Sequence, residues 1–136
     1  MYLLDTNVIS ELRKPHADAK VVAWAKSVIV PRMFISAITL KELETGVLRI
    51  ERRDPTQGKV LRTWLKRHVI PALDTRILPV DAAVALRCAH LHVPDRANEI
   101  DALIAATALV HGLTVVTRNV SDFKSIGVSL INPWDE

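Results

Sequence analysis

The feature that most constrains the fold is the alternation of short apolar runs with longer helical stretches along the whole chain. Residues 1–5, 33–35, 77–78, 114–117 and 129–131 are short apolar runs of the kind that forms buried strands. Buried strands separated by helices are typical of a parallel sheet that is covered on both faces. We therefore predict an α/β fold with four or five parallel strands, in which ligands bind at the carboxyl edge of the sheet.

Helices are predicted between these runs from apolar periodicity and from the residues at their ends. Asp18 and Asn98 can each cap a helix, and Gly112 suits the C-terminal stop of the helix that Asn98 begins. Pro15 ends the first helix, whereas Gly58 and Pro71 weaken the ends of the fourth. The predicted helices cover residues 8–14, 18–28, 38–53, 55–73, 82–91 and 99–111, and a loop covers 93–97.

Length and composition point to one compact domain over residues 1–136. The chain is 49% hydrophobic and 24% charged, which excludes disorder and low complexity. No basic segment precedes an apolar leader, and the most apolar run, residues 102–110, is too short to span a bilayer. The single cysteine, Cys88, is expected to be an inert core thiol, and His90 and His92 point to different helix faces, which argues against a histidine metal site. We expect a cytoplasmic protein with no membrane contact.

The charge is distributed unevenly. Residues 13–67 hold thirteen lysines and arginines against five acidic residues, although the net charge of the whole chain is only +3. Such a basic half favours a polyanion such as nucleic acid, and a solvated helical face would give the same count. Six aromatic residues are too few for the stacking platform of single-strand-binding proteins.

Four acidic residues fall where the predicted fold brings chain segments to the carboxyl edge of the sheet. Asp5 ends the first strand, Glu42 flanks the core face of the helix over 38–53, Asp101 lies in the first turn after Asn98, and Asp122 follows the fourth strand. Each also has a structural explanation as a helix cap, a dipole partner or a solvated charge. Their coincidence at one edge favours a functional site.

A cluster of this kind needs a cation. Two carboxylates about 4 Å apart repel by about 4 kcal/mol at an effective dielectric constant of about 20. All-oxygen ligand sets without histidine or cysteine select hard cations such as Mg²⁺ or Mn²⁺. Such ions activate water and neutralise charge during displacement at a phosphodiester. The hypothesis is hydrolysis with metal-activated water, with Asp5 and Asp101 as the main ligands and Glu42 and Asp122 as further ligands.

Four motifs in this order resemble the PIN domain of VapC-type toxins. They are Leu4-Asp5-Thr6-Asn7, Ser36-x-x-Thr39-x-x-Glu42-Leu43-x-x-Gly46, Asp101-x-x-Ile104-Ala105-Ala106-x-Ala108 and Thr117-x-Asn119-x-x-Asp122-Phe123. The opening residues 4–11 and the tail Ile131-Asn132-Pro133-Trp134 are similar to the FitB-like branch. The resemblance implies a PIN-like α/β/α sandwich and a Mg²⁺-dependent endoribonuclease, the toxin of a type II toxin–antitoxin pair.

The resemblance also implies roles for individual residues and for partners. Asp5, Glu42, Asp101 and Asp122 match the acidic quartet that binds Mg²⁺ or Mn²⁺, and Thr6, Thr117 and Asn119 match the polar residues that orient it. Many relatives carry aspartate where this chain has Asn119, so one metal ion is expected in the absence of RNA. A homodimer or larger oligomer and a small DNA-binding antitoxin of ribbon-helix-helix type are implied as well.

Further interpretations remain open at this point. Arg13, Lys14, Lys41 and Arg49 are candidates for holding the RNA backbone. Trp24, Leu61 and Trp64 fit either a core or an interface between subunits. The alternatives to a nuclease are a non-catalytic RNA-binding or antitoxin-sequestered protein, and a haloacid dehalogenase-type phosphohydrolase with Asp5 as nucleophile, whose usual second aspartate is replaced by Asn7.

Overall fold

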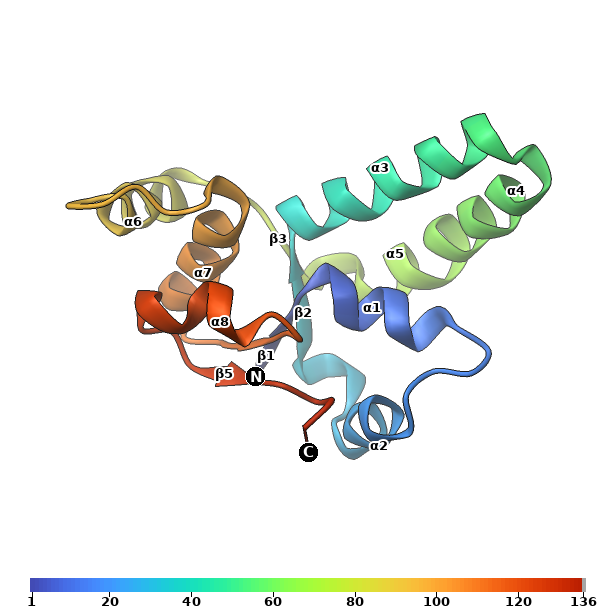
Figure 1. Cartoon of the computed structure of the whole chain (residues 1–136), viewed down its shortest axis with the longest axis horizontal. Coiled ribbons are helices and arrows are strands. Elements are labelled where there is room, and N and C mark those ends of the chain that lie inside the picture. Colours follow the sequence, from blue (N-terminus) through green and yellow to red (C-terminus); the bar gives the residue numbers. More distant parts are fainter. Residues whose placement is uncertain (136) are drawn as a thin grey trace.

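The computed structural model describes residues 1–135 and has a five-stranded parallel sheet at its centre (Figure 1). The strands are β1 (Tyr2–Leu4), β2 (Met33–Ser36), β3 (Ile77–Leu78), β4 (Thr114–Val116) and β5 (Leu130–Ile131). Their order in the sheet is β3-β2-β1-β4-β5, and every neighbouring pair is parallel. The predicted α/β class and the parallel sheet are therefore confirmed, with five strands.

The helices follow the predicted pattern closely. The α-helices are α1 (Thr6–Arg13), α2 (Ala19–Ser27), α3 (Ala37–Arg53), α4 (Pro55–Trp64), α5 (Ile70–Leu73), α6 (Ala82–Leu91), α7 (Glu99–His111) and α8 (Val120–Phe123). Asp18 accepts hydrogen bonds from the backbone N–H groups of Lys20 and Val21, and so caps α2 as predicted. Gly112 ends α7 in the left-handed conformation at φ 66°.

The prediction of one regular helix over 55–73 is wrong in its second half. A π-helical turn spans Leu65–Val69 between α4 and α5, and the N–H of Ile70 donates to the carbonyl of Leu65. Proline in a regular helix clashes with the carbonyl four residues earlier and lacks an N–H of its own. We attribute the wider turn to Pro71, which follows it directly.

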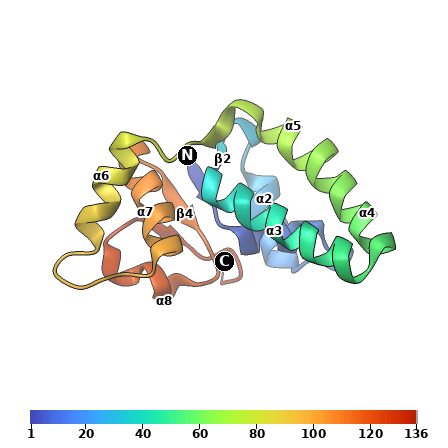
Figure 2. The ribbon, with the colours of Figure 1, turned by 90° about the horizontal axis from the view of Figure 1, so that it is seen from above.

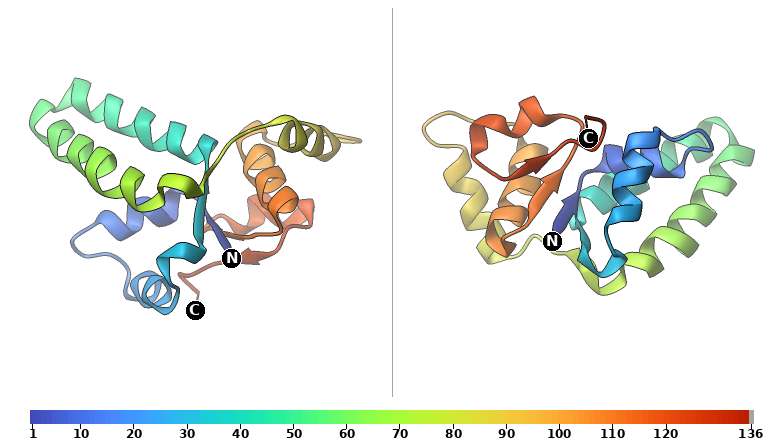
Figure 3. Two further views of the ribbon diagram at one scale, coloured as in Figure 1. Left: turned by 180° about the vertical axis from the view of Figure 1, so that it is seen from behind. Right: turned by 90° about the horizontal axis from the view of Figure 1, so that it is seen from below.

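Helices cover both faces of the sheet, as the α/β/α expectation requires. Because side chains alternate along a strand, Leu4 and Val116 pack on the face covered by α1 to α5, whereas Leu3 and Val115 pack with α7 and α8 on the other face. Figures 2 and 3 show α6, α7 and α8 on one side and the longer α3–α4 hairpin on the opposite side. The site described below lies between these two groups.

Three side chains fitted either a core or an interface, and they differ in burial. Leu61 is 8% exposed and belongs to the core on the α1–α5 side. Trp24 and Trp64 are partly buried and pack against the same core. Cys88 is buried between α6 and α7, as predicted. Within residues 1–135 no helix has the length and apolar character needed to cross a bilayer.

The α3–α4 hairpin is held by one arginine. Arg62 on α4 donates to both carboxylate oxygens of Glu44 at 2.5 Å and to Glu51 Oε1 at 3.0 Å. The hydrogen bonds from Arg62 lower the pKa of the Glu44 carboxyl. Two of the five acidic residues of the basic half thus pair with Arg62, and among the described residues Lys14 is the only other lysine or arginine of this half in an ion pair.

The close approach of α3 and α4 requires glycine at position 58. A Cβ at Gly58 would lie 2.4 Å from the Glu51 Cα, whereas a Cβ at Gly46 in the middle of α3 would meet nothing within 4 Å. We expect Gly58→Ala to lower the free energy of unfolding by about 1–3 kcal/mol through overpacking. The matched variant Gly46→Ala should instead raise it by up to about 1 kcal/mol through helix propensity. Chemical denaturation of both variants checks the contrast, and equal effects would contradict it.

Candidate active site

Asp5 is held rigidly at the carboxyl end of β1. Its side chain is 6% exposed and caps α1, because Oδ1 accepts from the backbone N–H of Thr6 at 2.8 Å. Its other oxygen, Oδ2, accepts from Thr117 Oγ1 at 2.8 Å and from Asn7 Nδ2 at 3.3 Å. The carboxylate is thereby fixed by two segments that are far apart in the sequence.

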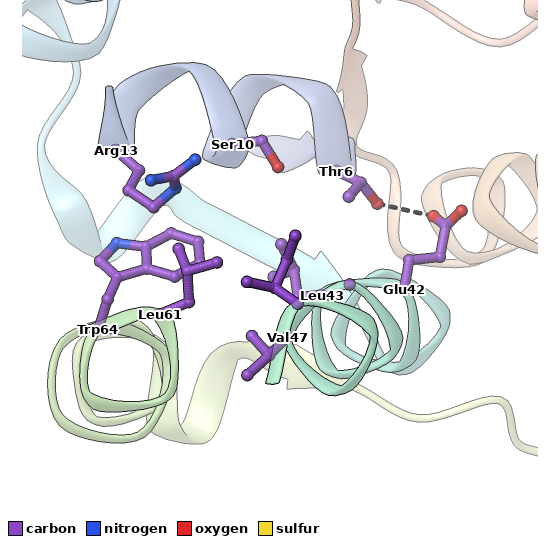
Figure 4. Close-up of a pocket in the computed structure, with 10 residues that line it drawn as sticks. Thr6, Ser10, Arg13, Glu42, Leu43, Val47, Leu61 and Trp64 are labelled. Carbon is purple, nitrogen blue, oxygen red and sulfur yellow. Dashed lines mark hydrogen bonds between the residues drawn. The ribbon is translucent and has the colours of Figure 1, made fainter. Parts of the chain in front are cut away.

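Glu42 reaches the same edge from α3. Ser36 begins this helix, since its Oγ accepts from the backbone N–H of Ile38 at 3.0 Å. Thr6 Oγ1 donates to Glu42 Oε1 at 2.6 Å, as Figure 4 shows. Thr6 therefore links the two acidic residues: its backbone N–H donates to Asp5, and its hydroxyl donates to Glu42.

Asp101 and Asp122 complete the cluster from the other side of the sheet. Asp101 lies in the first turn of α7, which begins with a hydrogen bond from its own N–H to Asn98 Oδ1 at 3.1 Å. Burial first, and then the charges of Asp122, Asp5 and Glu42 in that order, together raise the pKa of Asp101 to about 6. Asp122, Asp5 and Glu42 therefore all lie close enough to Asp101 for their charges to act on it.

The polar residues around the cluster form one hydrogen-bonded network. Thr117 is fully buried, and its Oγ1 accepts from the backbone N–H of Asn119 at 3.0 Å while donating to Asp5. Asn7 Nδ2 also donates to Thr117 Oγ1, and Asn7 Oδ1 accepts from the backbone N–H of Arg118 at 3.2 Å. Sequence reasoning assigned no role to Asn7, although its place two residues after Asp5 was a usable signal.

The ligand chemistry of this cluster fits a hard divalent cation. Within residues 1–135 no ion pair joins any of the four carboxylates to a lysine, arginine or histidine. Their negative charge thus lacks a cationic partner among the described residues, and burial makes the repulsion at Asp101 stronger. Oxygen-only ligand sets of this kind suit Mg²⁺ and Mn²⁺ better than zinc or copper.

Comparison with known proteins now gives the family. Residues 2–128 match the PIN domain. This chain belongs to the PIN domain family. It is 40% identical over 141 residues to Toxin FitB of Neisseria gonorrhoeae, with 100% of both chains covered. It is 38% identical over 143 residues to VapC ribonuclease Y4jK of Sinorhizobium fredii, with 99% of both covered. The crystal structure of FitAcB from Neisseria gonorrhoeae matches with a TM-score of 0.93 at 38% identity, covering 100% of both chains.

A second group of potential ligands in this PIN domain includes none of the four predicted acidic residues. Among the described residues, Cys88, His92 and Glu99 are the only such trio whose donor atoms all lie within 4.8 Å of one another. Sequence reasoning missed it, although the spacing of Cys88 and His92 by one helical turn was a signal. Cys88 Sγ lies 3.7 Å from His92 Nε2, which lies 3.1 Å from Glu99 Oε2.

Local hydrogen bonding favours a structural role for this second group. The backbone N–H of Ala97 donates to His92 Nδ1 at 3.1 Å, so the neutral ring carries its proton on Nε2 and directs it at Glu99. A metal at Nε2 would need a lone pair there. Burial also raises the pKa of the Cys88 thiol, which disfavours the thiolate that a metal requires. We interpret the trio as a link between the end of α6 and the start of α7.

The predicted RNA-binding cations occupy different settings. Arg13 lies over the Trp64 ring with its guanidinium carbon 5.8 Å from the ring centroid, and Lys14 pairs with Glu11 at 3.1 Å. Lys41 and Arg49 are exposed on α3, where Lys41 immediately precedes Glu42. Sequence reasoning did not single out Arg118, which is exposed next to Thr117. Its guanidinium carbon lies over the Trp134 ring, 5.1 Å from the ring centroid.

Proposed function

We propose that this PIN domain is a Mg²⁺-dependent endoribonuclease, the toxin component of a VapBC-like toxin–antitoxin pair. The observation that carries the proposal is the convergence of Asp5, Glu42, Asp101 and Asp122 at one sheet edge, with the pKa of Asp101 raised to about 6. Relatives of matching length are named VapC ribonuclease and Toxin FitB, which supports the same activity and role. Asn7, at the position of the second aspartate of haloacid dehalogenases, hydrogen-bonds to Asp5 and supports the nuclease over that phosphohydrolase.

The chain's own residues would hold the metal and its surroundings. Asp5 and Asp101 are the main ligands in this proposal, with Glu42 and Asp122 directly or through water. A bound Mg²⁺ or Mn²⁺ lowers the pKa of water and neutralises charge on the phosphodiester. Thr6 and Thr117 orient Glu42 and Asp5 through the hydrogen bonds described above, and Asn119 would supply a neutral oxygen where a further carboxylate could stand.

RNA would approach over the basic half of the chain. Lys41 and Arg49 are exposed on α3 and form no ion pair within residues 1–135. Each phosphate contact to a single strand contributes about 0.7 to the slope of log K against log salt. We expect the double variant Lys41→Ala and Arg49→Ala to bind RNA more weakly and to reduce this slope by about 1.4. Titrations at several salt concentrations measure it, and an unchanged slope would exclude this face.

The matched control for that experiment is Lys26→Ala. Lys26 is also exposed but lies on α2, which is not part of the α3 face. It should leave the salt dependence unchanged. A reduction equal to that of the double variant would show that only net charge matters and that no specific face is used.

The same proposal extends to partners and location. We infer that the whole chain, residues 1–136, is one cytoplasmic domain that forms a homodimer or larger oligomer. Its partner would be a small DNA-binding antitoxin, of ribbon-helix-helix type by family resemblance. A short reading frame beside the gene that encodes such a protein, and growth arrest on expression of this chain alone, would support the toxin role.

Cleavage of RNA by the purified protein tests the activity itself. We expect cleavage in Mg²⁺ or Mn²⁺, none after chelation, and recovery when the ion is returned. The competing candidate is a non-catalytic protein that binds RNA or is only sequestered by its antitoxin. Salt-dependent RNA binding with no cleavage in either ion would favour that candidate and contradict the proposed activity.

A further inference from the structure

The cleft beside the carboxylate cluster has features that the metal chemistry does not use. It lies between α1, α3 and α4 and has a volume of about 270 Å³. Figure 4 shows Thr6 and Glu42 at one end and the stacked pair Arg13 and Trp64 at the other. We propose that this cleft is a subsite for one nucleobase of the RNA, on one side of the phosphate that is cut; the inference rests on the proposed function.

The walls of the cleft suit a flat ring with apolar faces and a polar edge. Its floor is made by aliphatic side chains of α3 and α4, among them Leu43, Val47 and Leu61. The Ser10 hydroxyl projects into the cleft from α1, where it can meet a polar ring edge. A single aromatic ring binds a base by stacking in a sequence-tolerant way, without the multi-residue platform that the low aromatic content excludes.

The charges of the cleft favour a base over a phosphate inside it. Between Glu42 at the end nearest the cluster and Arg13 at the opposite end, the described lining residues carry no charge, so a phosphate in the middle of the cleft would lack a cationic partner. Arg13 at the opposite end is exposed and forms no ion pair within the described residues. Its guanidinium can therefore add a cation–π or backbone contact where the nucleotide leaves the cleft.

Single abasic substitutions in the RNA test this subsite without changing the protein. A set of substrates would each lack one base near the cleavage position, and kcat and KM would be measured with wild type and Trp64→Leu. We expect one fixed abasic position to raise the wild-type KM by about tenfold, and Trp64→Leu to raise it similarly on intact RNA. The KM of Trp64→Leu on the abasic RNA should be no higher than the KM after either change alone, because each change removes the same stacking contact.

Further variants separate stacking from general damage. Trp64→Phe should retain most of the affinity because a ring remains, and the exposed Arg13→Ala should show a smaller loss coupled to the same abasic position. The control Trp24→Leu removes another partly buried tryptophan, which does not line the cleft. The Trp24 ring packs edge-on against Tyr2, with the ring centroids 5.4 Å apart. Trp24→Leu should leave KM unchanged. Arg13→Ala keeps the test decisive if Trp64→Leu fails to fold.

The outcomes that would overturn the subsite differ from those that would overturn the nuclease. Cleavage that is insensitive to every abasic position, or equally sensitive in wild type and the Trp64 and Arg13 variants, would overturn the subsite alone. A wild-type protein that cuts no RNA in Mg²⁺ or Mn²⁺ would overturn the nuclease and the subsite with it.

Discussion

Asp5→Asn should reduce RNA cleavage by at least about a hundredfold, since even residues that only orient metal ligands contribute about ten- to a hundredfold. The carboxylate stands directly after β1 and receives hydrogen bonds from Thr6, Thr117 and Asn7. An asparagine has nearly the same shape and can still accept from the Thr6 N–H, but its NH2 group cannot accept from Thr117 and Asn7, and the charge that holds a divalent cation is lost. Initial rates on one RNA at saturating Mg²⁺ measure the loss, and Asp101→Asn should behave in the same way.

A matched control keeps this prediction specific. Asp81 caps α6 by accepting from the backbone N–H of Val84 at 3.0 Å, as Asp5 caps α1, but it is not part of the acidic cluster. Asparagine is as good a cap as aspartate, so neither variant should lose its helix. Asp81→Asn should cut RNA at the wild-type rate. Activity of Asp5→Asn within a few-fold of wild type would contradict the assignment of Asp5 as a ligand.

The second large effect is on stability, through Asp101. Its pKa is raised from 3.8 to about 6, by burial first and then by the neighbouring carboxylates. A raised carboxyl pKa means that the folded state binds the proton more tightly than the unfolded state. In the absence of divalent cations, the contribution of Asp101 to stability should therefore increase as pH falls from about 6 towards 3.8. Above pH 6 the ionised carboxylate opposes folding.

The difference in melting temperature between wild type and Asp101→Asn isolates the contribution of the Asp101 carboxyl to stability. Hydrogen bonds lower the pKa of Glu11 and of Glu44, so those groups destabilise the fold as pH falls and partly mask the effect in wild type alone. Melting temperatures in a chelator at pH 7.5, 6.0 and 5.0 should show wild type gaining on the variant as pH falls. A difference in melting temperature between the two proteins that stays the same at all three pH values would contradict the placement of Asp101 in the cluster.

A divalent cation should act in the opposite direction. Because it binds only the folded state, Mn²⁺ at a hundred times its Kd should stabilise the wild type by about 2.7 kcal/mol at pH 7.5. Mn²⁺ should stabilise Asp101→Asn by much less. Protonation competes with metal binding, so the gain in wild type should shrink as pH falls through about 6.

The sequence predicted those parts of the molecule that depend on local chemistry. Asp18 and Asn98 cap helices where expected, and Asp101 in the first turn of α7 lies close enough to Asp5 at the carboxyl end of β1 for the charge of Asp5 to raise its pKa. The π-helical turn over Leu65–Val69 was missed because apolar periodicity does not distinguish four- from five-residue hydrogen bonding.

Contacts between distant segments were the second kind of miss. The spacing of Asn7 from Asp5 is visible in the sequence, but its hydrogen bond to Thr117, more than a hundred residues away, is not predicted by any spacing rule. The link from His92 to Glu99 likewise depends on how the loop over 93–97 folds back. Stacking of Arg13 on Trp64 could not be read from the chain either, since it needs α1 and α4 to lie together.

Anomalous diffraction from a crystal soaked in Mn²⁺ tests the central claim most directly. We predict a peak coordinated by Asp5 and Asp101, with Glu42 and Asp122 directly or through water, and loss of that peak in Asp5→Asn. A peak confined to Cys88, His92 and Glu99, or no peak at the sheet edge in a soaked wild-type crystal, would contradict the account.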